Sequence, residues 1–205
     1  MTNAIFESVS APSPDHLQLA SPATAADTGV SPGVTGFYDE ATGSIQYVVA
    51  DPLTRKSAII DPVLDFDSRS GSTRTTSADR SLKHIETQGL TLEWILDTHP
   101  HADHFSAAGY LKDMTGASTG IGERVVEVQK LWKAIYNLPD GVPVDGSQWD
   151  RLFADGERFT VGEMEVSVLL SPGHTLSSVS GERGLRSRYP LHARFRDGAS
   201  RFPGR

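Results

Sequence analysis

Short runs of apolar residues in the first half of the chain predict β-strands. Ile45, Tyr47 and Val49 fall on one face of a predicted strand, and residues 58–60 form a second, wholly apolar run. Residues 91–96, TLEWIL, carry apolar side chains on both faces, which is typical of a buried strand. The pattern therefore predicts a strand pair that opens the domain and a buried strand that follows it.

Apolar positions spaced by three and four residues predict helices between and after these strands. Ser77 is expected to cap a helix that contains Leu82 and Ile85 and ends at Gly89. Residues 106–114 show the same spacing directly after the buried strand. The order of strands and helices indicates an α/β class of fold.

A later stripe predicts a helix whose apolar face packs on the core, with Trp132 as its anchor. The stripe consists of Val125, Val128, Leu131, Trp132 and Ile135. Tyr110, Trp132 and Tyr136 are accordingly expected in the core. Residues 67–76, polar and rich in Ser and Gly, predict a loop, and 159–161 and 164–168 predict two short strands.

Composition narrows the class of protein. The 205 residues, 38% of them apolar, are enough for one domain with a core. The chain has no cysteine, so a metal site would rest on histidine and carboxylate ligands. A net charge of -7 argues against nucleic-acid binding, and no apolar run is long enough to cross a bilayer. We expect a soluble, cytoplasmic protein whose oligomeric state the sequence leaves open.

The first 32 residues differ from the rest of the chain. Residues 1–32 are rich in Ala, Ser, Pro and Thr and have no periodic apolar pattern. They lack the basic start and apolar core of a secretory signal, and their acidic residues do not suit a transit peptide. We expect a flexible leader that precedes the folded domain.

The chemistry concentrates in residues 97–104, where three imidazoles and two carboxylates follow the buried strand within eight residues. Neutral imidazole nitrogen and carboxylate oxygen suit zinc, iron or manganese. The alternation of His99 and His101 lets two side chains of an extended segment converge on one metal, and Asp103 and His104 can face a second. A loop at the end of a strand is also where α/β sheets bind ligands.

Two motifs carry a resemblance to a known family. The stretches THPHADH at 98–104 and SPGHT at 171–175 resemble the metallo-β-lactamase superfamily. Together with IIDPV at 59–63 and the later LWKAIYNLP stretch, they look most like the persulfide dioxygenase branch, which is close to glyoxalase II. The resemblance covers residues 36–179 and implies an αββα sandwich, α+β in class, with an incomplete second half.

The resemblance implies one Fe(II) ion held by His99, His174 and a later Asp, with glutathione persulfide as substrate and sulfite and a free thiol as products. It leaves a hydrolase open as the alternative. In the dinuclear zinc relatives, His101 would join the first metal, Asp103 and His104 would hold the second, and a metal-bound hydroxide would attack a thioester. The substrate-binding residues are unknown in both cases.

The third carboxylate of the family's G-D-T or H-D-T motif is missing. Residues 33–180 are therefore expected to form a truncated domain, followed by an aberrant basic tail at 181–205. The tail has seven arginines against only Glu182 and Asp197, a local charge of +5. A nucleic-acid or membrane arm is one interpretation of this charge. An inactive, truncated remnant without metal is a third possibility for the chain as written.

A shifted reading frame explains the tail better. With permitted codons, residues 181–205 read one base later spell ANAAFVHDTLFMPDFGTARADFPG, which resembles the missing segment and its H-D-T aspartate. We therefore hypothesise that a small deletion after Ser180 changed the frame, so that the ligand Asp would span the codons of Arg188 and Tyr189. The nucleotide sequence tests this directly.

Overall fold

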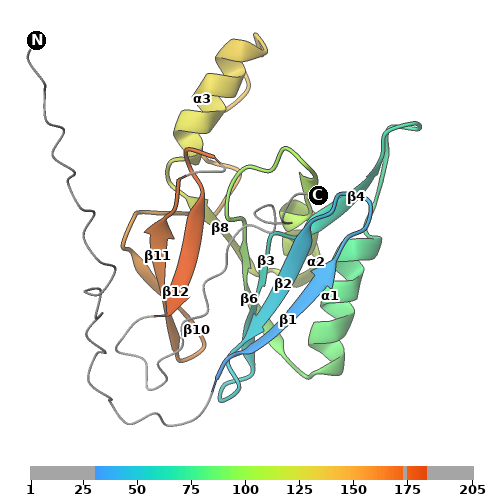
Figure 1. Cartoon of the computed structure of the whole chain (residues 1–205), viewed down its shortest axis with the longest axis vertical. Coiled ribbons are helices and arrows are strands. Elements are labelled where there is room, and N and C mark those ends of the chain that lie inside the picture. Colours follow the sequence, from blue (N-terminus) through green and yellow to red (C-terminus); the bar gives the residue numbers. More distant parts are fainter. Residues whose placement is uncertain (1–30, 173–174, 184–205) are drawn as a thin grey trace, which may run out of the picture.

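The main element of the fold is a six-stranded mixed sheet in a computed structural model that describes residues 31–172 and 175–183 (Figure 1). Its strands in spatial order are β1 (Gly33–Tyr38), β2 (Ile45–Ala50), β3 (Lys56–Ile60), β6 (Thr91–Leu96), β8 (Ser118–Gly122) and β9 (Arg151–Phe153). The first three pair antiparallel, and β3, β6, β8 and β9 run parallel. The predicted strand pair and the strand at 91–96 are confirmed, although Ile95 is the only buried residue of the latter.

Two helices cover one face of this sheet. They are α1 (Thr76–Thr87) and α2 (Ala108–Thr115), and both belong to crossovers between parallel strands. Parallel neighbours need such crossovers, which place helices on the sheet face. Ile59, Ile95 and Leu111, each fully buried, form the centre of the core between the sheet and these helices.

A second sheet covers the opposite face. It consists of β10 (Arg158–Val161), β11 (Met164–Leu170) and β12 (Val179–Arg183), all antiparallel. Alternate residues of β11 are buried, as expected for a strand with one face on a core. Within the described residues the layers are therefore helix, sheet and sheet, in agreement with the α+β sandwich that the sequence predicted (Figure 1).

The expectation of a loop at residues 67–76 was wrong in its detail. β4 (Val63–Asp67) and β5 (Ser72–Arg74) form a hairpin, and β7 (Phe105–Ser106) pairs with β4 on the other side. The Gly71 N–H donates to the Asp67 carbonyl, and the positive φ of Gly71, 69°, allows this tight reversal. The polar composition of the segment reflects the outer part of the hairpin, where residues 66–74 are exposed, whereas Val63 at the start of β4 is buried.

The predicted cap of α1 was also wrong. The helix begins at Thr76, two residues before the start that a Ser77 cap implies, and Ser77 is buried inside its first turn. Asp65 of β4 supplies the acceptors instead, because its two carboxylate oxygens accept from the Ser77 backbone N–H and hydroxyl at 2.9 and 2.7 Å. The cap therefore comes from a residue distant in sequence, which local patterns do not reveal.

The expectation that α3 (Val125–Ile135) packs fully on the core is wrong for its second half. Val125 and Val128 are buried, but Trp132 and Ile135 are 42% and 58% exposed. Tyr136, also expected in the core, is 65% exposed and stacks on Trp132 with ring centroids 5.2 Å apart. The helix extends away from the sheets (Figure 1), and Lys133 in its last turn donates to the Asp140 and Val142 carbonyls of the following loop instead of packing on a sheet.

Most of the predicted leader and tail lies outside the described residues. The boundary expected after Ser180 falls inside β12, which continues to Arg183. In the part of the chain that the structure describes, no helix has both the length and the apolar composition required to cross a membrane.

Candidate metal centre

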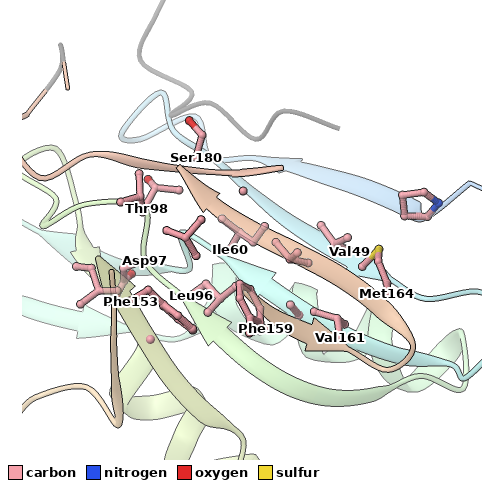
Figure 2. A pocket seen from close by; sticks show the side chains of 18 residues that line it. Val49, Ile60, Leu96, Asp97, Thr98, Phe153, Phe159, Val161, Met164 and Ser180 are labelled. Atoms are coloured by element: carbon pink, nitrogen blue, oxygen red, sulfur yellow. The ribbon is translucent and has the colours of Figure 1, made fainter. Parts of the chain in front are cut away.

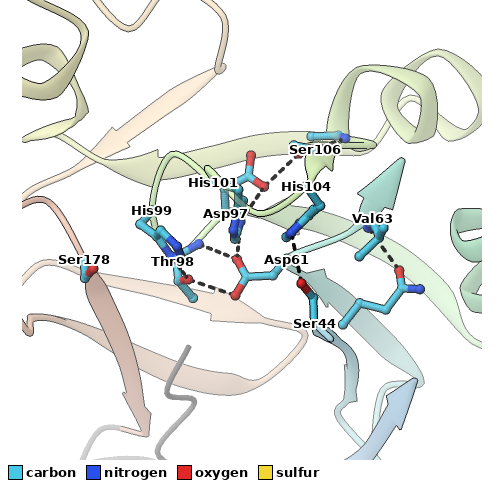
Figure 3. A network of polar contacts seen from close by, with 12 residues as sticks. Ser44, Asp61, Val63, Asp97, Thr98, His99, His101, His104, Ser106 and Ser178 are labelled. Atoms are coloured by element: carbon cyan, nitrogen blue, oxygen red, sulfur yellow. Dashed lines mark hydrogen bonds and ion pairs between the residues drawn. The ribbon is translucent and has the colours of Figure 1, made fainter. Parts of the chain in front are cut away.

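The histidine loop lies at the carboxyl edge of the parallel strands (Figure 3). β3 ends at Ile60 and β6 ends at Leu96. Because the two strands are parallel, the residues that follow each strand lie at the same edge of the sheet. Asp61 and Asp97 occupy these positions and are buried. The strand ends therefore bring two carboxylates beneath the loop that carries the imidazoles.

The three imidazoles predicted as ligands lie against one another. The ring centroids of His99 and His101 are 4.2 Å apart, and those of His101 and His104 are 4.1 Å apart. Ligand atoms of His99, His101 and Asp103 all lie within 4.8 Å of one another. The structure thus brings together four of the five predicted ligands, whereas His174 lies outside the described residues.

Each imidazole has one ring nitrogen against a neighbouring polar group. His101 Nε2 lies 3.1 Å from an oxygen of Asp61, and His99 Nδ1 lies 2.9 Å from the Thr98 hydroxyl. His104 Nδ1 lies 3.3 Å from both the Ser44 hydroxyl and an Asp103 oxygen. Histidine ligands usually have such an outer partner, because it fixes the tautomer and directs the other nitrogen to the metal.

Buried carboxylates control the charge of the centre. Burial lowers the pKa of His101, but the hydrogen bonds to Asp61 and Asp97 outweigh it and raise the pKa to about 10. Burial and the neighbouring His101 charge lower the pKa of His104. Without a metal, an imidazolium at His101 therefore lies against the carboxylates of Asp61 and Asp97, and a bound cation would replace that proton.

Asp103 remains ionised in the same environment. Burial raises the pKa of Asp103, but the hydrogen bond from the Ser44 hydroxyl and the proximity of His104 outweigh burial and lower the pKa to about 2. Its side chain is 42% exposed, whereas that of His104 is 1% exposed. The loop therefore presents a permanent negative charge beside buried nitrogen donors.

The donor set fits a divalent metal. Among the described residues, no hydrogen-bond partner reaches the buried Nε2 atom of His104. An imidazole nitrogen buried without a partner costs free energy, about 1–3 kcal/mol, and a metal ligand role accounts for it. Nitrogen and carboxylate donors without thiolate suit iron, zinc or manganese. The structure does not distinguish among these ions.

Sequence reasoning missed Asp61 as a residue of this site. Asp61 accepts from the Thr98 backbone N–H at 2.7 Å and from the Thr98 hydroxyl at 2.8 Å, besides its contact with His101. It adopts a left-handed backbone, φ 52°, which is unusual for a non-glycine residue and is common at functional sites. An acidic residue followed by Pro62 at a strand end was the signal available in the sequence.

An apolar cavity of about 70 Å³ lies between the two sheets and reaches the loop at Asp97 and Thr98 (Figure 2). Ile60, Phe159 and Val166 are among its apolar walls. The Val179 N–H donates to the Thr98 carbonyl at 3.0 Å, so β12 of the second sheet holds the loop directly. The metal centre therefore stands where both sheets meet.

The layers and the donor set define a metal-binding α+β sandwich with its site at a sheet edge. The sequence profile of the Metallo-beta-lactamase superfamily matches residues 45–187, and the chain belongs to this superfamily.

Relatives in this superfamily carry different names. The chain is 64% identical over 150 residues to a beta-lactamase hydrolase-like protein of Xylella fastidiosa, covering 73% of this chain and 35% of the relative. It is 24% identical over 144 residues to the human mitochondrial persulfide dioxygenase ETHE1, and this match covers 70% of this chain and 45% of the relative. The crystal structure of ETHE1 from Myxococcus xanthus matches with a TM-score of 0.54 and 28% identity, covering 74% and 53%. The chain spans half or less of the length of these two curated relatives.

Proposed function

We propose that the domain forms a mononuclear iron(II) centre that oxidises a small persulfide such as glutathione persulfide. The observation that carries this proposal is the convergence of His99, His101 and Asp103 within 4.8 Å. The family resemblance implies that His99 supplies one ligand of an iron site of two imidazoles and one carboxylate, with His174 and a later Asp as the other two, and this is the donor composition of non-haem iron oxygenases. The similarity to proteins named ETHE1, one of them a persulfide dioxygenase, supports the same choice.

The residues of the loop divide into holding and positioning roles. His99 would hold the ion together with His174 and the Asp of the missing segment, as the family resemblance implies, and His101 and Asp103 lie within 4.8 Å of His99. Asp61 and Thr98 orient the imidazoles through their ring nitrogens. Bound iron(II) would supply dioxygen activation. One persulfide, one dioxygen and one water would give one thiol and one sulfite with two protons.

The test compares the chain as written with a chain whose residues after Ser180 are replaced by the shifted-frame segment. We expect weak iron retention and very low turnover for the written chain, because a facial site without its carboxylate from the missing segment loses charge balance. The replaced chain should bind one iron and consume oxygen with glutathione persulfide, and His99→Ala should abolish both. Iron bound at one per chain without oxygen uptake would contradict the proposal.

A thioester hydrolase with two zinc ions is the second candidate. The buried His104 Nε2 favours it, since this nitrogen adds a donor beyond the three that converge on one ion. Two zinc ions per chain and thioester turnover in the absence of oxygen would establish this function. Failure of both chains to retain iron or zinc would instead identify an inactive remnant.

A further inference from the structure

Ser44 contacts the candidate metal centre from a turn that lies 60 residues before His104 in the sequence. It precedes β2 and is 8% exposed, and its hydroxyl donates to Asp103 Oδ2 at 2.7 Å. The same oxygen of Ser44 lies 3.3 Å from His104 Nδ1, and Asp103 Oδ2 lies 3.3 Å from that nitrogen. Three polar atoms from three side chains therefore form a closed triangle at the edge of the donor cluster.

The proton count in this triangle fixes the tautomer of His104. Ser44 has one hydroxyl proton and gives it to the carboxylate, so its oxygen can only accept from His104. Asp103 Oδ2 accepts the Ser44 proton, so it also faces His104 Nδ1 as an acceptor. Because both neighbours of Nδ1 are acceptors, Nδ1 carries the ring proton. The lone pair of the imidazole then lies on Nε2, which is buried beside His101.

The backbone around Ser44 holds this hydroxyl in place. The Ser44 carbonyl accepts from the Asp39 N–H at 2.9 Å, and the Ser44 N–H donates to the Thr42 hydroxyl at 3.3 Å. The Asp39 carboxylate accepts in turn from the Thr42 N–H and hydroxyl at 2.9 and 2.7 Å. Hydrogen bonds thus fix the turn from Asp39 to Ser44 at both ends. They position the Ser44 hydroxyl in the metal-free protein.

We propose that Ser44 is a positioning residue of the metal centre that sets the tautomer of His104 and anchors the outer oxygen of Asp103. With Oδ2 held by Ser44, the Oδ1 atom of Asp103 remains on the side of His101, 3.8 Å from its Nδ1. The inference rests on the proposed metal centre, and it holds for one metal ion or two.

The primary test reads the tautomer in the metal-free, full-length chain labelled with 15N-histidine. Long-range 1H–15N spectra, assigned with His104→Gln, should show His104 protonated at Nδ1 and unprotonated at Nε2. Ser44→Ala should give a mixture of tautomers, and Ser44→Thr, which keeps the hydroxyl, should restore the wild-type pattern. A wild-type His104 protonated at Nε2, or a Ser44→Ala spectrum identical to wild type, would overturn the proposal.

A second test measures zinc(II) affinity by competition with a chelator. Ser44→Ala should weaken binding by about 10- to 100-fold, the usual effect of removing an outer partner of a ligand. Ser70→Ala is the matched control, because the Ser70 hydroxyl also donates to an aspartate, Asp67, at 3.0 Å, but on an exposed turn. Unchanged affinity in Ser44→Ala would show a merely structural serine. Absence of zinc binding in both the chain as written and the chain with the replaced tail would contradict the metal centre, while the tautomer still decides the role of Ser44.

Discussion

The two faces of the six-stranded sheet are covered in different ways. On the helix face, α1 and α2 pack around fully buried residues such as Ile59 and Ile95. On the sheet face, β10, β11 and β12 pack against neighbouring positions such as Ile60, and about 70 Å³ of apolar space remains. The histidine loop borders this second face of the sheet at Asp97 and Thr98. The difference indicates that the helix face supplies stability, whereas the sheet face has room beside the candidate site.

The largest expected effect comes from truncating adjacent residues of β3 that face opposite sides. Ile59→Ala should destabilise the fold by about 4 kcal/mol and Ile60→Ala by about 2 kcal/mol, because Ile60 already borders a cavity and loses fewer contacts. Equilibrium urea unfolding of both variants measures the difference. Equal losses would remove the distinction between the faces.

The junction of the two sheets should be nearly as sensitive. A Cβ added at Gly162, in the turn between β10 and β11, would lie 2.0 Å from the Thr54 hydroxyl and 2.6 Å from Asp51 Oδ2. With its φ of 60°, Gly162→Ala should cost about 3 kcal/mol. Gly89→Ala is the control, since Gly89 has a φ of 59° and nothing near the added Cβ, and should cost about 1 kcal/mol. A thermal melt compares the two, and a matching shift would show that backbone strain alone matters.

Added volume should have opposite effects on the two faces. Ala58→Val points into the cavity on the sheet face and should stabilise by up to about 1 kcal/mol. Ala78→Val enlarges a fully buried residue of α1 on the helix face and should destabilise by about 1–2 kcal/mol. Chemical denaturation midpoints give the sign of each change, and two losses would mean that the cavity does not accept a larger side chain.

The smallest effect is an acid dependence on the helix face. The hydrogen bond from the Lys112 ammonium, followed by those from the Thr119 N–H and hydroxyl, lowers the pKa of Asp150 to about 2. Because the folded pKa lies below the unfolded value near 4, the contribution is complete above pH 4 and is lost as the pH falls toward 2. Asp150→Asn should therefore show a shallower loss of stability between pH 4 and 2 than wild type.

The control for this acid effect is Asp113→Asn, which changes an exposed residue of α2, the helix that also carries Lys112. Urea midpoints across this pH range should follow wild type in Asp113→Asn. If Asp150→Asn also follows wild type, the link between α2 and β8 does not contribute to acid stability.

Much of the fold could be predicted because its signals are local. The apolar runs at 45–50 and 91–96 became β2 and β6, and the helical spacing after the loop became α2. The ligand-rich loop was visible for the same reason, since His99, His101 and His104 lie within six residues of one another. Short-range periodicity and residue spacing survive folding unchanged.

The failures share a physical cause. The stripe of α3 predicted burial, but a periodic apolar face states only that a helix can pack, and no described element covers Trp132 or Ile135. Ser77 was expected as a cap, yet the acceptor for the first turn comes from Asp65 on a neighbouring strand. Local pattern does not encode which distant segment supplies a partner.

The sequence by itself determined the strands at 45–50 and 91–96, the superfamily motifs and the candidate histidine and aspartate donors of the loop, because these depend on residues close together in the chain. Only the tertiary structure decided which outer groups hold them. Ser44 and Asp61 approach the loop from 60 and 40 residues away, and parallel pairing of β3 with β6 places Asp61 beneath His101. The orientation and protonation of a metal ligand depend on such contacts across the sheet, since hydrogen bonding and burial act through space.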